Sequence, residues 1–257
     1  MPSMAATKAS PRLSDAQLQQ VLPLIEGADS VELKLTVPAD AHRAAIDGLG
    51  LDPLEAQIRQ VFFLDTPDLA LFGSGVVVRA RRVQGKGDDS VVKLRPVIPA
   101  ELPRKLRETS GFGVEVDAMP GGFTCSASLK GVPPADVRAT LTGRGPLRKL
   151  LTKQQRRLFE EYGPAGIQLD DLTVLGPIFV LKLRSAPADF GRKLVAELWL
   201  YPDDSRVLEL STKCAPSEAF EVAARGRAFL AAHGIDLTGD QETKTRRALE
   251  QFAAARA

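Results

Sequence analysis

Charged side chains recur at every second position in several short segments of this 257-residue sequence. Alternate residues of a β-strand point to the same side, so each set shares one face of a strand. The sets are Glu32 and Lys34; Arg79 and Arg81; Lys93 and Arg95; Glu115 and Asp117; Lys182 and Arg184; Glu197; Glu209 and Lys213. Arginine and lysine bind phosphate oxygens, and carboxylates bind hard divalent cations. The residue types therefore suit phosphate chemistry assisted by a metal ion.

Charged strand faces are most often the solvated outer surface of an antiparallel sheet. In this chain, however, paired charges replace the usual mixture of Thr, Ser, Gln and Lys on nearly every strand. If the sheet closes into a barrel, these faces point inward, where like charges require a neutralising ligand. A polyvalent anion would satisfy the basic residues and a divalent cation the acidic ones. The alternative, an open sheet, predicts that Arg79, Lys93 and Glu209 lie on different surfaces.

Eight segments are predicted to be strands that position these charges, and most of their connections are short enough for antiparallel hairpins. The predicted strands are 31–37, 57–64, 75–83, 90–95, 112–117, 178–184, 193–200 and 207–213. The predicted helices are 15–25, 38–49, 133–141, 146–162, 216–233 and 238–256. Gly121 and Gly122 are expected to break a strand. No role is assigned to the stretches 99–111 and 121–134.

Composition excludes several classes of protein. The 34 basic and 32 acidic residues give a net charge of +2, which argues against a protein that coats DNA. Two cysteines and two histidines are too few for a disulfide framework or for histidine-based zinc chemistry, so any metal is expected to be Mg2+ or Mn2+ on carboxylates. No signal peptide or membrane span is found, and we expect a cytoplasmic protein. Residues 1–12 are predicted to be a disordered tail, and 13–257 a single domain.

Five segments together resemble one known family. SVELKL (30–35) is similar to a Glu-x-Glu-x-Lys signature, and FFLDTPDLAL (62–71) to an aromatic strand followed by Asp-Thr-Pro. VVVRARRV (76–83) and VVKLRPV (91–97) resemble paired basic strands, and AELWLYPDDSRVLELSTK (196–213) resembles late acidic strands with a terminal basic residue. In this order they resemble the CYTH family, the triphosphate tunnel metalloenzymes, over most of the chain.

The resemblance implies an α+β fold, with an eight-stranded antiparallel closed β-barrel and flanking helices. It also implies a triphosphatase that uses Mg2+ or Mn2+ to hydrolyse a phosphoanhydride bond of inorganic triphosphate or of a nucleoside or organic triphosphate. The implied catalytic residues are Glu32, Lys34 and Glu209. The implied metal ligands are Glu32, Glu115, Glu197 and Glu209. The implied substrate contacts are Lys34, Arg79, Arg81, Lys93, Arg95, Lys182, Arg184 and Lys213. A triphosphate-containing small molecule is the expected partner, with no DNA or membrane, and a homodimer is considered.

The chain departs from the family pattern at three places. Ser30 stands where the signature has its first Glu, Lys182 and Arg184 occupy a strand expected to be acidic, and Glu197 has no second Glu beside it. Fewer carboxylates would weaken metal binding, reduce the number of ions or abolish catalysis. A class IV-type adenylate cyclase and a non-catalytic polyphosphate- or nucleotide-binding module therefore remain alternatives. Lys244 either lies on a solvated helix face or reaches the tunnel mouth.

Overall fold

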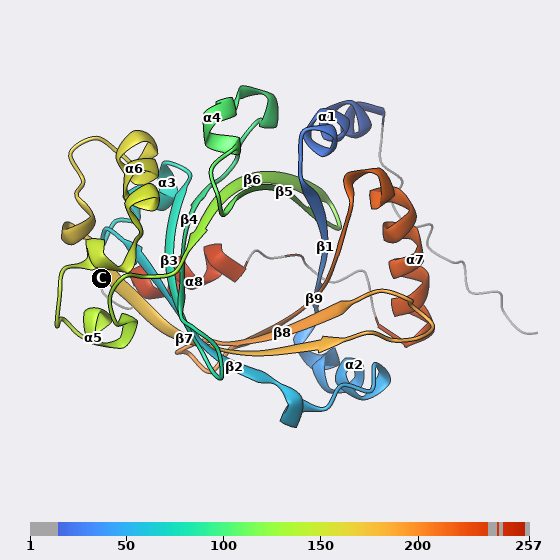
Figure 1. Ribbon diagram of the computed structural model, residues 1–257. Coiled ribbons are helices and arrows are strands. Elements are labelled where there is room, and N and C mark those ends of the chain that lie inside the picture. Colours follow the sequence, from blue (N-terminus) through green and yellow to red (C-terminus); the bar gives the residue numbers. More distant parts are fainter. Residues whose placement is uncertain (1–14, 236–240, 242–243, 255–257) are drawn as a thin grey trace, which may run out of the picture.

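A computed structural model describes residues 15–235, 241 and 244–254, and the predicted tail 1–12 lies outside this range. Nine strands close into a barrel in the order β1-β5-β6-β4-β3-β2-β7-β8-β9 (Figure 1). Their bounds are β1 Ser30–Val37, β2 Gln57–Asp65, β3 Val76–Val83, β4 Asp89–Leu94, β5 Phe112–Met119, β6 Gly122–Gly131, β7 Thr173–Ser185, β8 Leu194–Leu200 and β9 Arg206–Cys214. The open-sheet alternative is therefore wrong.

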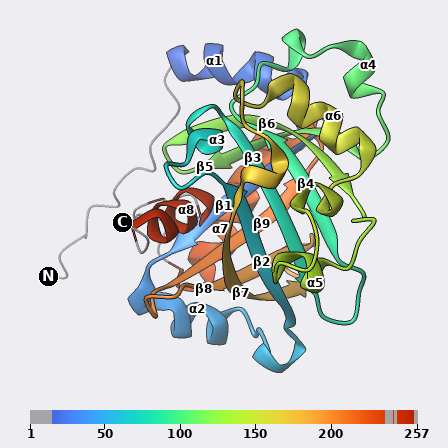
Figure 2. The same cartoon turned by 90° about the vertical axis from the view of Figure 1, so that its left-hand side faces the viewer.

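Helices surround the barrel and cover the apolar outer faces of most strands. The α-helices are α1 Asp15–Glu26, α2 His42–Gly48, α3 Ala70–Gly73, α4 Arg104–Arg107, α5 Val137–Leu141, α6 Lys153–Tyr162, α7 Ala219–Ala232 and α8 Lys244–Ala254. Figure 2 shows the wall formed by β7, β2, β3 and β4, with α6 and α5 beside it. None of the described helices is long and apolar enough to cross a membrane.

The alternation read from the sequence divides the barrel into an apolar outer layer and a charged interior. On β1, Val31, Leu35 and Val37 are buried in outer clusters, while Glu32 and Lys34 line the interior. Phe190 and Phe229 stack at 4.9 Å in the cluster formed by α7 with β1, β8 and β9. Burial of these outer faces stabilises the barrel at roughly 25 cal/mol per Å2 of apolar surface. The apolar half of each strand therefore supports the charged half.

The strand prediction was wrong in number and in direction. The additional strand, β6, lies in the stretch 121–134, and Gly121 with φ of +88° forms the tight hairpin that joins it to β5. This glycine, which was expected to end a strand, connects two strands instead. In addition, β1 pairs with β5 in parallel, so the sheet is mixed and not purely antiparallel. The other stretch, 99–111, contains α4 and joins β4 to β5.

The start of β7 was also missed, because the strand contains a proline. It begins at Thr173, five residues before the predicted start, and Gly176 and Pro177 lie where the register with β2 shifts between Val61 and Phe63. A proline removes one ladder hydrogen bond and is tolerated at such irregularities. A capping box begins α6: the Thr152 hydroxyl accepts the Gln155 N–H, and the Gln155 side chain accepts the Thr152 N–H.

Candidate active site inside the barrel

All nine strands contribute side chains to one cavity of about 1750 Å3. All twelve site residues expected from the sequence line it. Within the described part of the chain, thirteen basic and eight acidic residues line this space, a surplus of five positive charges. The near balance of the whole sequence therefore conceals a strongly basic interior, which favours a polyvalent anion as the ligand.

Three carboxylates meet where β1 and β5 run in parallel. The register pairs Ser30 with Glu115 and Glu32 with Asp117, and oxygens of Glu32, Glu115 and Asp117 lie within 4.8 Å of one another. The Ser30 hydroxyl donates to Glu115 Oε2 at 3.3 Å, so the strand opposite the missing first Glu supplies a carboxylate. We call these three acidic residues the carboxylate trio.

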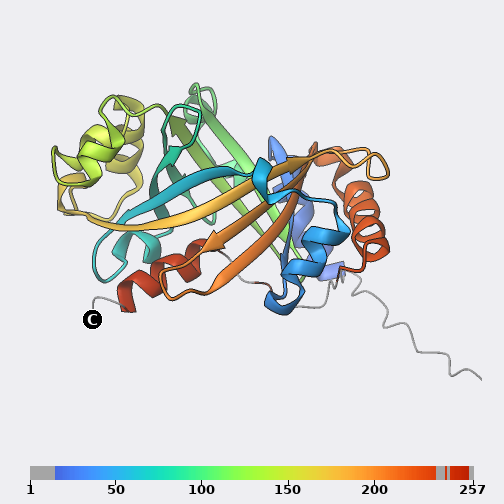
Figure 3. The ribbon, with the colours of Figure 1, turned by 90° about the horizontal axis from the view of Figure 1, so that it is seen from below.

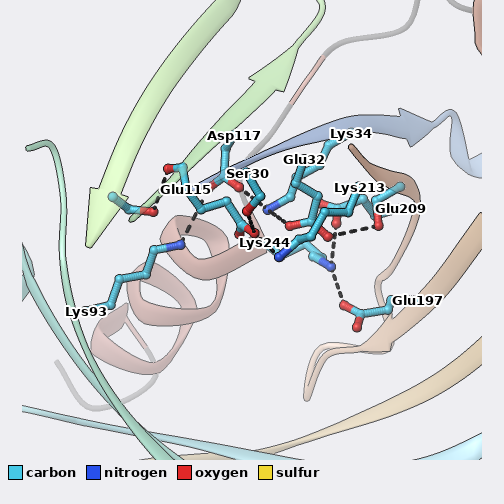
Figure 4. Close-up of polar contacts among 12 residues, drawn as sticks. Ser30, Glu32, Lys34, Lys93, Glu115, Asp117, Glu197, Glu209, Lys213 and Lys244 are labelled. Carbon is cyan, nitrogen blue, oxygen red and sulfur yellow. Dashed lines mark hydrogen bonds and ion pairs between the residues drawn. The ribbon is translucent and has the colours of Figure 1, made fainter. Parts of the chain in front are cut away.

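Asp117 is the most enclosed member of the trio, with 1% of its side chain exposed. Lys34 Nζ lies 2.7 Å from its Oδ1 and Lys93 Nζ 3.5 Å from its Oδ2 (Figure 4). Arg95 Nη1 lies 3.1 Å from the same Oδ2. Burial opposes ionisation of Asp117, but these three cations outweigh it and lower the pKa to about 2. Burial likewise opposes a charge on Lys34, and Asp117 and Glu32 (3.1 Å from Nζ) outweigh it and raise its pKa. Asp117 and Lys34 are thus ionised at neutral pH.

The other two predicted metal ligands lie apart from the trio. Glu197 and Glu209 are paired across β8 and β9, and Lys244 Nζ lies 2.6 Å from Glu197 Oε2 and 2.8 Å from Glu209 Oε1. Lys182 Nζ lies 2.6 Å from Glu197 Oε1. Burial raises the pKa of Glu197, but Lys244 and Lys182 outweigh it and hold the pKa well below its usual range. The predicted set of four ligands therefore separates into two groups.

Basic side chains of β2, β3 and β7 form the wall of the cavity that faces the carboxylate trio. Arg81 makes two 2.7 Å hydrogen bonds to the carboxylate of Asp89. Arg79 has no ion pair to a described residue, and its Nε is buried without a hydrogen-bond partner. Burial lowers the pKa of Arg79, yet a guanidinium keeps its charge in proteins. A buried cation of this kind is satisfied by an anion that enters the cavity.

Three of the charged cavity residues that sequence reasoning left without an assigned role are central to the site. Asp117 was on the correct strand face but was not assigned to the site, although its position two residues after Glu115 was a usable signal. Arg59 was overlooked because apolar residues dominate its strand; it is buried, lines the cavity and donates to Gln57 Oε1. Lys244 was left open, and it reaches the cavity.

Comparisons with known proteins agree on the fold. No family model matches the sequence, and no curated protein matches it. A solved structure of HpAC1 from Hippeastrum, a proposed adenylyl cyclase with a dominant triphosphatase activity, has a TM-score of 0.59 at 18% identity, covering 82% of this chain and 91% of that chain. A proposed adenylate cyclase from Bacillus halodurans has a TM-score of 0.59 at 12% identity, covering 86% and 97%. The chain shares the fold of these two proteins.

Proposed function

We propose that this protein is a divalent-metal-dependent triphosphatase that hydrolyses a phosphoanhydride bond of a triphosphate inside the barrel. The observation that carries the proposal is the basic surplus of the cavity, which includes a buried Arg79 without an anionic partner, next to a carboxylate trio. A triphosphate carries about four negative charges near neutral pH and matches such a surplus. The dominant triphosphatase activity of HpAC1, which shares the fold, supports the same proposal.

The carboxylate trio fits a hard divalent cation. Its donors are all oxygens from Glu32, Glu115 and Asp117, which is the ligand chemistry of Mg2+ and Mn2+. Such an ion, when bound, neutralises phosphate charge and lowers the pKa of a coordinated water. Lys34 lies between Glu32 and Asp117, so its ammonium would be available to a phosphate oxygen if an ion neutralised these carboxylates.

The basic residues of β3 and β4 are placed to hold the phosphates. Lys93 and Arg95 approach the trio from β4, while Arg79 and Arg81 extend the basic surface along β3. Cations fixed in this way bind the phosphate oxygens and stabilise the charge that develops on the leaving phosphate. We assign Lys182, Arg184 and Lys213 to the same anion surface, with Lys182 shared with Glu197 and Lys213 paired with Glu115.

Phosphate release tests the proposal. Tripolyphosphate, ATP and thiamine triphosphate are each incubated with Mg2+ or Mn2+ and the wild-type protein, Glu32→Gln or Lys93→Ala. We expect metal-dependent release by the wild type and a loss of at least about 100-fold in kcat/KM for each variant, as for the removal of a transition-state contact. Glu108→Gln, in an exposed ion pair with Arg104, is the matched control and should retain activity.

The same assay separates the alternatives. Formation of cyclic AMP and pyrophosphate from ATP would identify a cyclase. Retained tripolyphosphate binding without turnover of any substrate would identify a binding module. A homodimer and a cytoplasmic location remain predictions.

A further inference from the structure

The pair Glu197 and Glu209 has a different environment from the carboxylate trio. Its two carboxylates lie at directly paired positions of β8 and β9, and both contact the ammonium of Lys244 (Figure 4). The exposed fractions of the side chains are 10% for Lys244, 16% for Glu197 and 6% for Glu209. These ion pairs are therefore shielded from bulk solvent. Electrostatic interactions are stronger in such an interior than in water.

The charges of this pair are already balanced. Two carboxylates face two ammonium groups, since Lys182 also contacts Glu197 at 2.6 Å. The indole N–H of Trp199 donates to Glu197 Oε2 at 3.3 Å, and the Lys244 ammonium lies 4.9 Å from the Trp199 ring. A divalent cation placed here would have to displace both ammonium groups, including that of Lys244.

The pair also lacks ligands for a hard cation, which takes about six oxygen donors including several from the protein or substrate. Within the described part of the chain, only Glu32, Glu115 and Asp117 bring three carboxylates together. The next inward residue of β9 after Glu209 is Ser211, and its hydroxyl donates to Glu32 at 3.2 Å. The residues around Glu197 and Glu209 therefore do not fit a metal ion.

Lys244 is fixed in place by the helix that it begins. Ala248 and Leu249 of α8 are buried against Phe63, Trp199 and other residues at one end of the barrel, and Figure 3 shows α8 at this end. The Tyr201 hydroxyl donates to the Lys244 carbonyl at 3.2 Å. Helix docking thus delivers one positive charge to the interior of the barrel.

We propose that Lys244 serves as a built-in counterion that takes the place of a second metal ion at Glu197 and Glu209, so that the protein binds one divalent cation per chain, at the carboxylate trio. The single ion rests on the proposed function, whereas the exclusion of a second ion rests on Lys244. The metal role predicted from the sequence for Glu197 and Glu209 is replaced by a role in anchoring α8.

Titration with Mn2+ alone, followed by the electron paramagnetic resonance signal of free Mn2+, tests this inference without substrate. The wild type should bind one Mn2+, and Lys244→Met should gain a second, weaker site. Lys244→Arg retains the charge and should bind one. Arg246→Met removes a charge from the same helix and should also bind one. Two bound ions in the wild type, or no additional ion in a folded Lys244→Met, would overturn the proposal.

A second variant keeps the test decisive if Lys244→Met loses the docking of α8. The double substitution Glu197→Gln and Glu209→Gln should leave Mn2+ affinity within about twofold of the wild type, because neither carboxylate binds the ion. A tenfold or greater loss would overturn the proposal. Absence of triphosphate hydrolysis with this binding pattern intact would refute the proposed function alone. A wild type that binds no Mn2+ would refute the single ion and the metal requirement of the proposed function. A site gained only in Lys244→Met would still support the role of Lys244 as a counterion.

Discussion

Replacement of Asp117 by asparagine removes the carboxylate on which Lys34, Lys93 and Arg95 converge. The change is nearly isosteric, so its main effect is the loss of one buried negative charge. The lowering of the Asp117 pKa from 3.8 to about 2 corresponds to about 2 kcal/mol in favour of the ionised folded state. We therefore expect Asp117→Asn to lower the free energy of unfolding by about 2 kcal/mol at pH 7.

The pH dependence of this loss has a definite sign. The pKa of Asp117 is lower in the folded protein, so its stabilisation is fully present above the unfolded value of 3.8 and disappears as the pH falls towards about 2. Urea unfolding at several pH values should show a difference between wild type and Asp117→Asn that is constant from pH 7 to 5 and smaller at pH 3. Glu108→Gln, in an exposed pair, should cost at most about 0.5 kcal/mol.

Ligand binding by Asp117→Asn provides a stricter test, because two effects of opposite sign are expected. The freed cations should bind tripolyphosphate more tightly than wild type in the presence of EDTA. The reduced carboxylate set should bind Mn2+ at least about tenfold more weakly. Isothermal titration calorimetry measures both. Unchanged stability at pH 7, or changes of both affinities in the same direction, would refute the electrostatic account of the site.

Three further predictions concern other parts of the protein. Arg79→Met should weaken tripolyphosphate binding at least about tenfold in calorimetry. It should not lower the free energy of unfolding, because this buried cation has no ion pair to a described residue. A clear loss of stability would contradict this prediction. Gln155→Ala should lower the free energy of unfolding in urea by about 2–3 kcal/mol, since the buried side chain donates to the carbonyls of Ser90 and Leu129, both at 3.0 Å. A loss below about 0.5 kcal/mol would show that these hydrogen bonds are not needed for stability. The thiols of Cys125 and Cys214 should react with Ellman's reagent at pH 8 only after unfolding, because both are buried. Burial also raises the pKa of both thiols, that of Cys125 to about 11. Rapid labelling of the native protein would count against this packing.

The sequence was sufficient to identify which side chains face the interior. Alternation along a strand assigns Arg79 and Lys93 to a face without knowledge of the strand's neighbours, which is why all twelve predicted residues line the cavity. It was not sufficient to show how the carboxylates group. That grouping depends on the parallel pairing of β1 with β5 and on the pairing of Glu197 with Glu209, which join distant parts of the chain.

Local signals also misled at two places. β6 carries small and hydroxyl residues such as Ser126 and Ala127 next to a Gly-Gly pair, so it lacks the bulky alternation that marked the other strands. The role of Lys244 depends on how α8 docks, and the pattern of its helix is equally consistent with a solvated face. Both features become clear only from contacts between elements.

The most direct test of the proposed function is a crystal structure with Mn2+ and a non-hydrolysable triphosphate analogue. Anomalous scattering locates the metal independently of the phosphate density. We predict one Mn2+ on Glu32, Glu115 and Asp117, with the phosphates inside the barrel against Arg79, Lys93 and Arg95. An analogue bound outside the barrel, or a metal located away from the carboxylate trio, would contradict the proposed site.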